Sequence, residues 1–83
     1  MEALPAVTGK RLLKLLVADG WIEARNTRHG VFLQKPFRNG IRTTVVKNSR
    51  AIIPAGTLAQ ILGPKQTGLT RAGLRQLIQK YGL

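Results

Sequence analysis

Apolar residues recur at helical spacing near the start of the chain. The repeat is carried by Leu12, Leu13, Leu15, Leu16 and Val17. Thr8 precedes the repeat and is a favourable N-cap, and Gly20 can end a helix in the left-handed conformation. The pattern therefore predicts a helix over residues 9–19.

The segments that follow are rich in β-branched and aromatic residues and predict three strands, at 21–26, 29–35 and 41–47. Pro36 is expected to end the second strand because proline has no N–H for the ladder. Asn39-Gly40 is a strong hairpin-turn signal, since both residues tolerate positive φ. Together these signals predict an antiparallel meander.

The remaining residues predict one broken helix or two short helices, over 57–62 and 71–81. Gly63-Pro64 should break the helical pattern between them, because proline lacks a donor and clashes with the preceding turn. Thr70 is the second expected N-cap, and Gly82 ends the last helix. The order predicts one α+β domain over 1–83: a two-layer sandwich with the helices on one face of a three-stranded antiparallel sheet.

The second strand also predicts which residues lie on the open face of the sheet. Alternation directs His29, Val31 and Leu33 to one side and Phe32 to the other. We expect Phe32, the bulkiest, to face the helices, which leaves the other three on the open face. Because exposed apolar residues ringed by charge often mark a protein partner, Val31 and Leu33 are candidate interface residues.

Charge changes this picture, because it is unevenly distributed along the 83 residues. The net charge is +11, yet the three acidic and three basic residues of 1–23 cancel, so 24–83 carries eleven Lys and Arg and no acidic side chain. A chain that is 43% hydrophobic has a core to bury and is not a disordered basic tail. A polyanion is the expected partner, with nucleic acid favoured over an anionic membrane.

Several classes of protein are excluded or disfavoured. The chain has no Cys, and therefore no disulfide, thiolate zinc site or cysteine nucleophile. Apolar runs of four or five residues cannot span a membrane, and no signal-peptide pattern begins the chain. Three carboxylates, all before residue 24, are poorly placed to hold magnesium. We expect a soluble cytoplasmic protein without metal or cofactor.

His29 is the chain's single histidine and its candidate catalytic residue, next to Arg28 and near Arg25. An imidazole can take the proton of an RNA 2′-hydroxyl while cations stabilise the charge that develops on the attacked phosphate. Such cleavage needs no metal and spares DNA. The alternative is a surface histidine that merely forms hydrogen bonds.

The basic residues are candidates for RNA binding, because ordinary solvated surfaces mix both signs of charge and this segment does not. The candidates are Arg25, Arg28, Lys35, Arg38, Arg42, Lys47 and Arg50, with Lys10 and Lys14 on the solvated face of the first helix. Aromatics make up only 5%, so recognition by base stacking is weakly supported.

Several blocks, in this order and spacing, make the chain resemble the HicA toxins, small mRNA interferases of type II toxin–antitoxin systems. The resemblance covers about 8–70 and is carried by 8–16, 19–21, Arg25, His29, Phe32, 54–58, 61–62 and 68–69. It implies an α-β-β-β-α fold like that of double-stranded-RNA-binding domains. It also implies that His29 is catalytic, and that a cognate HicB-type antitoxin binds the toxin and blocks access to this histidine.

The chain departs from the family pattern at several positions. The family motif Gly-Ser-His, commonly followed by a second histidine, is replaced by Thr27, Arg28, His29 and Gly30, and Asn48 stands where many members have a further histidine. Gly63-Pro64 resembles an insertion. Two other classes of function stay open: a non-catalytic RNA- or DNA-binding module, and a small assembly protein.

Overall fold

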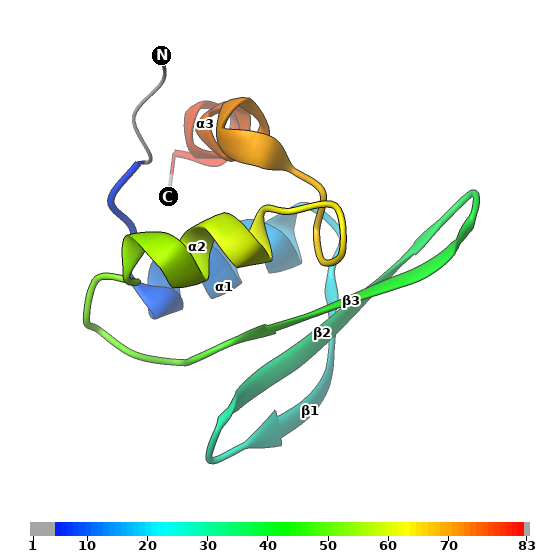
Figure 1. Ribbon diagram of the computed structural model, residues 1–83, viewed down its shortest axis with the longest axis horizontal. Helices are drawn as coiled ribbons and strands as arrows, with labels where there is room; N and C mark the ends of the chain where they lie inside the picture. Colours follow the sequence, from blue (N-terminus) through cyan, green and yellow to red (C-terminus); the bar gives the residue numbers. More distant parts are fainter. Residues whose placement is uncertain (1–4, 83) are drawn as a thin grey trace.

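The computed structural model describes residues 5–82, which form three helices and one three-stranded sheet (Figure 1). The elements are α1 (Gly9–Ala18), β1 (Ile22–Thr27), β2 (Gly30–Phe37), β3 (Gly40–Val46), α2 (Ala55–Ile61) and α3 (Thr70–Tyr81). The sheet is antiparallel in the order β1-β2-β3. The predicted α+β class and element order are confirmed; residues 1–4 and 83 of the predicted domain lie outside the described part.

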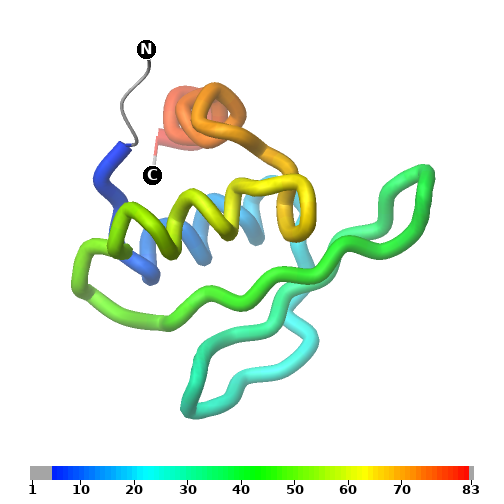
Figure 2. Tube along the Cα trace, in the orientation of Figure 1, coloured from blue at the N-terminus to red at the C-terminus, as the bar shows by residue number. Residues whose placement is uncertain are grey.

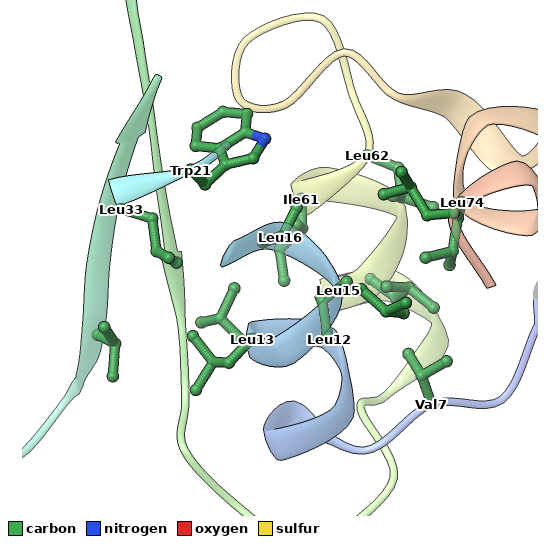
Figure 3. Close-up of a cluster of buried hydrophobic side chains, with 14 residues drawn as sticks. Val7, Leu12, Leu13, Leu15, Leu16, Trp21, Leu33, Ile61, Leu62 and Leu74 are labelled. Atoms are coloured by element: carbon green, nitrogen blue, oxygen red, sulfur yellow. The ribbon is translucent and has the colours of Figure 1, made fainter. Parts of the chain in front are cut away.

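The helices lie on one face of the sheet, and α1 occupies the centre of the molecule. In Figure 3, Leu33 of β2 and Leu74 of α3 lie on opposite sides of α1, and all three elements contribute to one buried cluster. In Figure 1, α3 lies on the far side of α1 and α2 from the sheet. The final helix is therefore stacked on α1, a detail that the sequence pattern did not predict.

Local signals at the two ends of α1 act as expected. The Thr8 hydroxyl accepts a hydrogen bond from the Arg11 N–H at 3.1 Å and so satisfies one free donor of the first turn. At the other end Gly20 has φ of 100°, and the Trp21 N–H donates to the Leu16 carbonyl at 2.9 Å. The turn at Gly20 ends α1 and leads directly into β1, which begins at Ile22.

The predicted end of the second strand is wrong, because β2 continues through Pro36 to Phe37. Pro36 pairs with Ile41 of β3, whereas the pairing with β1 begins only at Gln34, opposite Ile22. At Pro36, β2 therefore has a neighbouring strand on one side only. A proline is tolerated at such an edge because no second neighbour needs its missing N–H.

The predicted faces of β2 are also wrong. Val31 and Leu33 are only 2% and 0% exposed and pack in the core, whereas Phe32 lies on the open face. Phe32 stays partly covered there because the Arg25 guanidinium lies 5.2 Å from its ring centroid. Two aliphatic side chains, Val31 and Leu33, face the helices in place of one aromatic side chain. Because side chains alternate strictly between the two faces, every residue of β2 then faces the opposite side from the one predicted.

The segment between α2 and α3 folds back onto the first half of β3, which follows the second hairpin turn. Arg42 donates hydrogen bonds to the carbonyl oxygens of Pro64, at 2.6 Å, and Gln66, at 3.2 Å. The buried Thr44 hydroxyl donates to Gln66 Oε1 at 2.6 Å. The predicted break at Gly63-Pro64 is confirmed, and the Arg42 side chain satisfies two backbone carbonyl groups of the segment that follows.

Thr70 provides a stability prediction. The N-cap of α3 is Leu69, one residue before the predicted Thr70, which is the first residue of the helix. The Thr70 hydroxyl accepts the Gly73 N–H at 3.3 Å, but its φ of 64° is unfavourable for a β-branched residue. Asparagine can accept the same hydrogen bond and tolerates positive φ. We expect Thr70→Asn to raise the free energy of unfolding by about 0.5–1 kcal/mol, measured by denaturant titration. Thr70→Ala, which keeps the strain and loses the hydrogen bond from the Gly73 N–H, should lower it. An asparagine variant no more stable than wild type would contradict this prediction.

Candidate nucleic-acid interface

His29 lies in the turn that joins β1 to β2, not within a strand as predicted. Arg28 and His29 are the two turn residues, and both are exposed. Figure 2 shows this turn projecting from the sheet, away from the helices. An extended nucleic-acid chain can therefore approach the imidazole without entering a cavity.

Two neighbouring residues hold this turn in shape. The Thr27 hydroxyl accepts the His29 backbone N–H at 3.2 Å and donates to the Gly30 carbonyl at 3.0 Å. Gly30 has φ of 145°, and a Cβ atom there would lie 2.9 Å from Val45 Cγ1. Thr27 and Gly30 thus brace both sides of the turn and give the exposed His29 a defined backbone.

A hollow of about 500 Å³ lies between α1, β1 and Asn48, which follows β3 in the chain. It is lined by Lys10, Leu13, Lys14, Val17, Ala18, Glu23 and Asn48. The floor is apolar and comes from α1, while polar and charged groups stand around it. Two lysines four residues apart on one helix face present their ammonium groups together, an arrangement suited to successive phosphates.

The His29 turn and this hollow meet at the end of β3. Gly30 lies against the backbone of Val46, because a Cβ on Gly30 would be 3.2 Å from the Val46 carbonyl oxygen. The chain then runs through Lys47 to Asn48, which lines the hollow. The end of β3 thus links the turn to the hollow, and we call Lys10, Lys14, Lys47 and the turn residues Arg28 and His29 the α1–turn surface.

Two of the predicted RNA-binding cations have intramolecular partners. The Lys35 ammonium donates to the Asp19 carbonyl at 2.7 Å and forms an ion pair with the Asp19 carboxylate at 3.3 Å. The Arg42 guanidinium holds the α2–α3 segment, as described above. Both cations also lie 5.4 Å from the Phe37 ring centroid. They stabilise the fold on the helix side of the sheet, and we leave them out of the proposed RNA site.

The other predicted cations are spread over separate parts of the surface. Arg25 lies on the open face of the sheet over Phe32. Arg38 is a residue of the second hairpin turn, at the opposite end of the eight-residue β2 and so roughly 25–30 Å from His29. Arg50 is exposed in the segment before α2. Only some of these cations can therefore act near the histidine.

The predicted interface residues Val31 and Leu33 are corrected by their burial. Both belong to the core, so a partner cannot contact them without unfolding β2. The apolar residues on the open face are those at the alternate positions of the strands, such as Phe32. A protein partner on the open face would therefore contact residues other than Val31 and Leu33.

Sequence reasoning missed Glu23 as a member of the site and noticed Asn48 only as a departure from the family pattern. Glu23 pairs with Leu33 across the β1–β2 ladder, so it points to the helix side of the sheet and into the hollow. The irregularity between Glu23 and Arg25 places Arg25 on the other face. A bulge in a short polar strand leaves no clear pattern in the sequence, and nothing in it could have separated these two residues.

Two further searches cover the described residues. Within 5–82 no three histidine, cysteine or acidic side chains come together in a group that could bind a metal ion. No helix in this part of the chain is long and apolar enough to cross a bilayer.

Comparison with known proteins adds one finding to this geometry. The family model described as "HicA toxin of bacterial toxin-antitoxin" matches residues 9–69. The chain belongs to the HicA toxin family. No curated protein and no solved structure matches the chain. Membership in HicA implies the role of toxin and the existence of an antitoxin partner.

The structure explains one departure from the HicA pattern. The second histidine of the family motif is replaced by Gly30, whose positive φ and close contact with Val45 leave no room for a side chain. Asn48, in place of the later histidine, lines the hollow. An amide can donate and accept hydrogen bonds there but cannot titrate near neutral pH. In this HicA chain His29 is the single imidazole.

Proposed function

We propose that this HicA toxin is an endoribonuclease that cleaves mRNA without a metal ion and uses His29 as its catalytic residue. The observation that carries the proposal is the position of His29, exposed in a braced turn that the end of β3 links to the hollow lined by Lys10 and Lys14. A HicB-type antitoxin would neutralise the toxin by covering this turn. The substrate would be encountered in the cytoplasm.

The proposed reaction is transfer of a phosphodiester to the neighbouring 2′-oxygen. His29 takes the proton of the 2′-hydroxyl, and the 2′-oxygen attacks the adjacent phosphorus. The bond to the 5′-oxygen breaks, and this oxygen takes a proton from a solvent water molecule as it leaves. The products are a 2′,3′-cyclic phosphate and a 5′-hydroxyl end. Arg28, the neighbour of His29 in the turn, is placed to stabilise the negative charge on the phosphate.

The substrate chemistry gives the test of this proposal. In the presence of EDTA, the protein is expected to cut single-stranded RNA and to leave DNA of the same sequence intact, because DNA lacks the attacking 2′-hydroxyl. Gel electrophoresis should show the RNA fragments, and mass spectrometry should show that they end in a 2′,3′-cyclic phosphate. Equal cleavage of DNA, or complete loss of RNA cleavage on chelation, would refute the proposal.

Lys10 and Lys14 are expected to hold RNA phosphates beside the turn. Lys10→Ala/Lys14→Ala should weaken RNA binding and make the slope of log K against log salt shallower by about 1.4, or about 0.7 for each phosphate that a lysine no longer neutralises. Alanine favours the helix, so α1 should stay intact. The control is Lys65→Ala/Lys80→Ala, which removes the same charge from the α2–α3 segment and α3. Equal slopes for the two double variants, measured by fluorescence anisotropy, would exclude the α1–turn surface.

A non-catalytic RNA-binding module is the second candidate. Within residues 5–82, His29 forms a hydrogen bond through its backbone N–H, and no side chain orients its imidazole. A general base usually has such an orienting group. Salt-sensitive RNA binding with no cleavage would favour the module over the toxin nuclease.

A further inference from the structure

The open face of the sheet carries an apolar patch that no part of the described chain covers. Its rows follow from the strand register: Arg25, Phe32 and Val45; Ile22, Gln34 and Thr43; Pro36 and Ile41. Ile22 and Ile41 are 64% and 68% exposed, and Val45 is 36% exposed. All three helices lie on the other side of the sheet (Figure 1). We call these eight residues the open-face patch.

The composition of the open-face patch identifies the kind of partner it fits. Five of its eight residues are apolar, one is a cation, and none is acidic. An RNA site requires several cations, because binding to phosphates is largely electrostatic. Lys10 and Lys14 belong to α1, on the other side of the sheet. A protein surface with an apolar centre and an acidic group opposite Arg25 matches this patch better.

Charge also argues against a second copy of this chain as the occupant. Each copy carries a net charge of +11, and residues 24–83 contain no acidic side chain to pair with Arg25 of the other copy. Two such surfaces would bring like charges together. An acidic partner has no such penalty and gains from long-range attraction.

We propose that the open-face patch is the docking surface for the antitoxin and that the antitoxin meets it with an apolar surface that carries acidic groups. This inference rests on the proposed function for its regulatory meaning. Arg25, Phe32 and Val45 form the row of the patch nearest the His29 turn, since the next pair on this face of the sheet is Thr27 and Gly30, which flank the turn. A partner seated on the patch thus lies beside the histidine and obstructs the approach of RNA.

The test is a calorimetric titration of the full chain with its purified cognate antitoxin. Ile22→Glu/Ile41→Glu should weaken antitoxin binding at least 100-fold, because it removes the apolar contacts and adds acids that face the acidic partner. Ile22→Thr/Ile41→Thr keeps β-branched side chains in the strands and should still weaken binding about 10-fold. Gln76→Glu/Gln79→Glu adds the same charge on α3, on the far side of the molecule, and should bind like wild type. Thermal unfolding checks that each variant is folded.

The outcomes distinguish three molecules that could bind the open-face patch: the antitoxin, a second copy of this chain, and RNA. Unchanged antitoxin affinity in both isoleucine variants would overturn the proposal. If the wild type self-associates and the isoleucine variants do not, the patch belongs to an interface with a second copy. If the isoleucine variants lose RNA affinity but keep antitoxin affinity, the patch binds RNA. Either result overturns the proposal. Binding is measured directly, so a protein that fails to cleave RNA would refute the proposed function and leave this test readable.

Discussion

Gly9→Ala is expected to destabilise the protein by at least about 3 kcal/mol, at the upper end of the range for overpacked cores. A Cβ atom on Gly9 would collide with the Lys47 carbonyl oxygen and would lie 3.1 Å from the Ser49 backbone nitrogen. Both neighbours are backbone and cannot rotate away. Because a chain of this length is stable by about 4–12 kcal/mol, this one methyl group could remove much of the total.

Gly56→Ala is the matched control for this prediction. It makes the same chemical change in α2, where an added Cβ meets no atom within 4 Å. Alanine has the higher helix propensity, so the control should gain up to about 0.5–1 kcal/mol. Urea titrations of the two variants give the comparison. A Gly9 variant as stable as the Gly56 variant would show that α1 does not need close approach to the end of β3.

The contact at Gly9 also matters for the site. The Lys10 N–H donates to the Ser49 carbonyl at 3.0 Å, so the start of α1 and the segment after β3 are held together. Lys47 and Asn48 lie in this segment, and Asn48 lines the hollow. Loss of this packing should therefore separate the lysines of α1 from the histidine.

The elements of the fold could be predicted because their signals are local. Thr8 is a cap, Gly63-Pro64 is a break, and the period of the leucines in α1 is helical; none of these depends on distant residues. The family resemblance was confirmed by the match over residues 9–69. Local chemistry and the order of the blocks were sufficient for the architecture.

The orientation of the strands could not be predicted in the same way. A strand with apolar residues on both faces is consistent with either orientation, and the choice depends on what the helices present to the sheet. Val31 and Leu33 were assigned to the wrong face for this reason. The bulk of Phe32 misled the assignment, because its ring is covered by Arg25 in place of the core.

The roles of individual cations were equally hidden in the sequence. Lys35 and Arg42 look like their basic neighbours, yet both are used within the fold, by Asp19 and by carbonyl groups of the α2–α3 segment. Their partners are 16 to 24 residues away along the chain. A charge count predicts a polyanion as partner but cannot identify which cations are available to bind it.

His29→Ala is expected to lower the rate of RNA cleavage about 10³-fold, within the range that a general base contributes. The side chain is exposed and the turn is held by Thr27 and Gly30, so its removal should not alter the fold. RNA affinity should stay within about 3-fold of wild type, because the cations of the α1–turn surface remain in place. His29→Gln, which retains a polar side chain without a titratable imidazole, should be equally inactive.

The most direct test of the account is therefore the single-turnover rate of RNA cleavage in EDTA for wild type and His29→Ala, at protein concentrations that saturate the RNA. We predict cleavage by the wild type and a rate about 10³-fold lower for the variant, with equal unfolding temperatures. Equal rates for the two proteins would contradict the central claim that His29 is the catalytic residue.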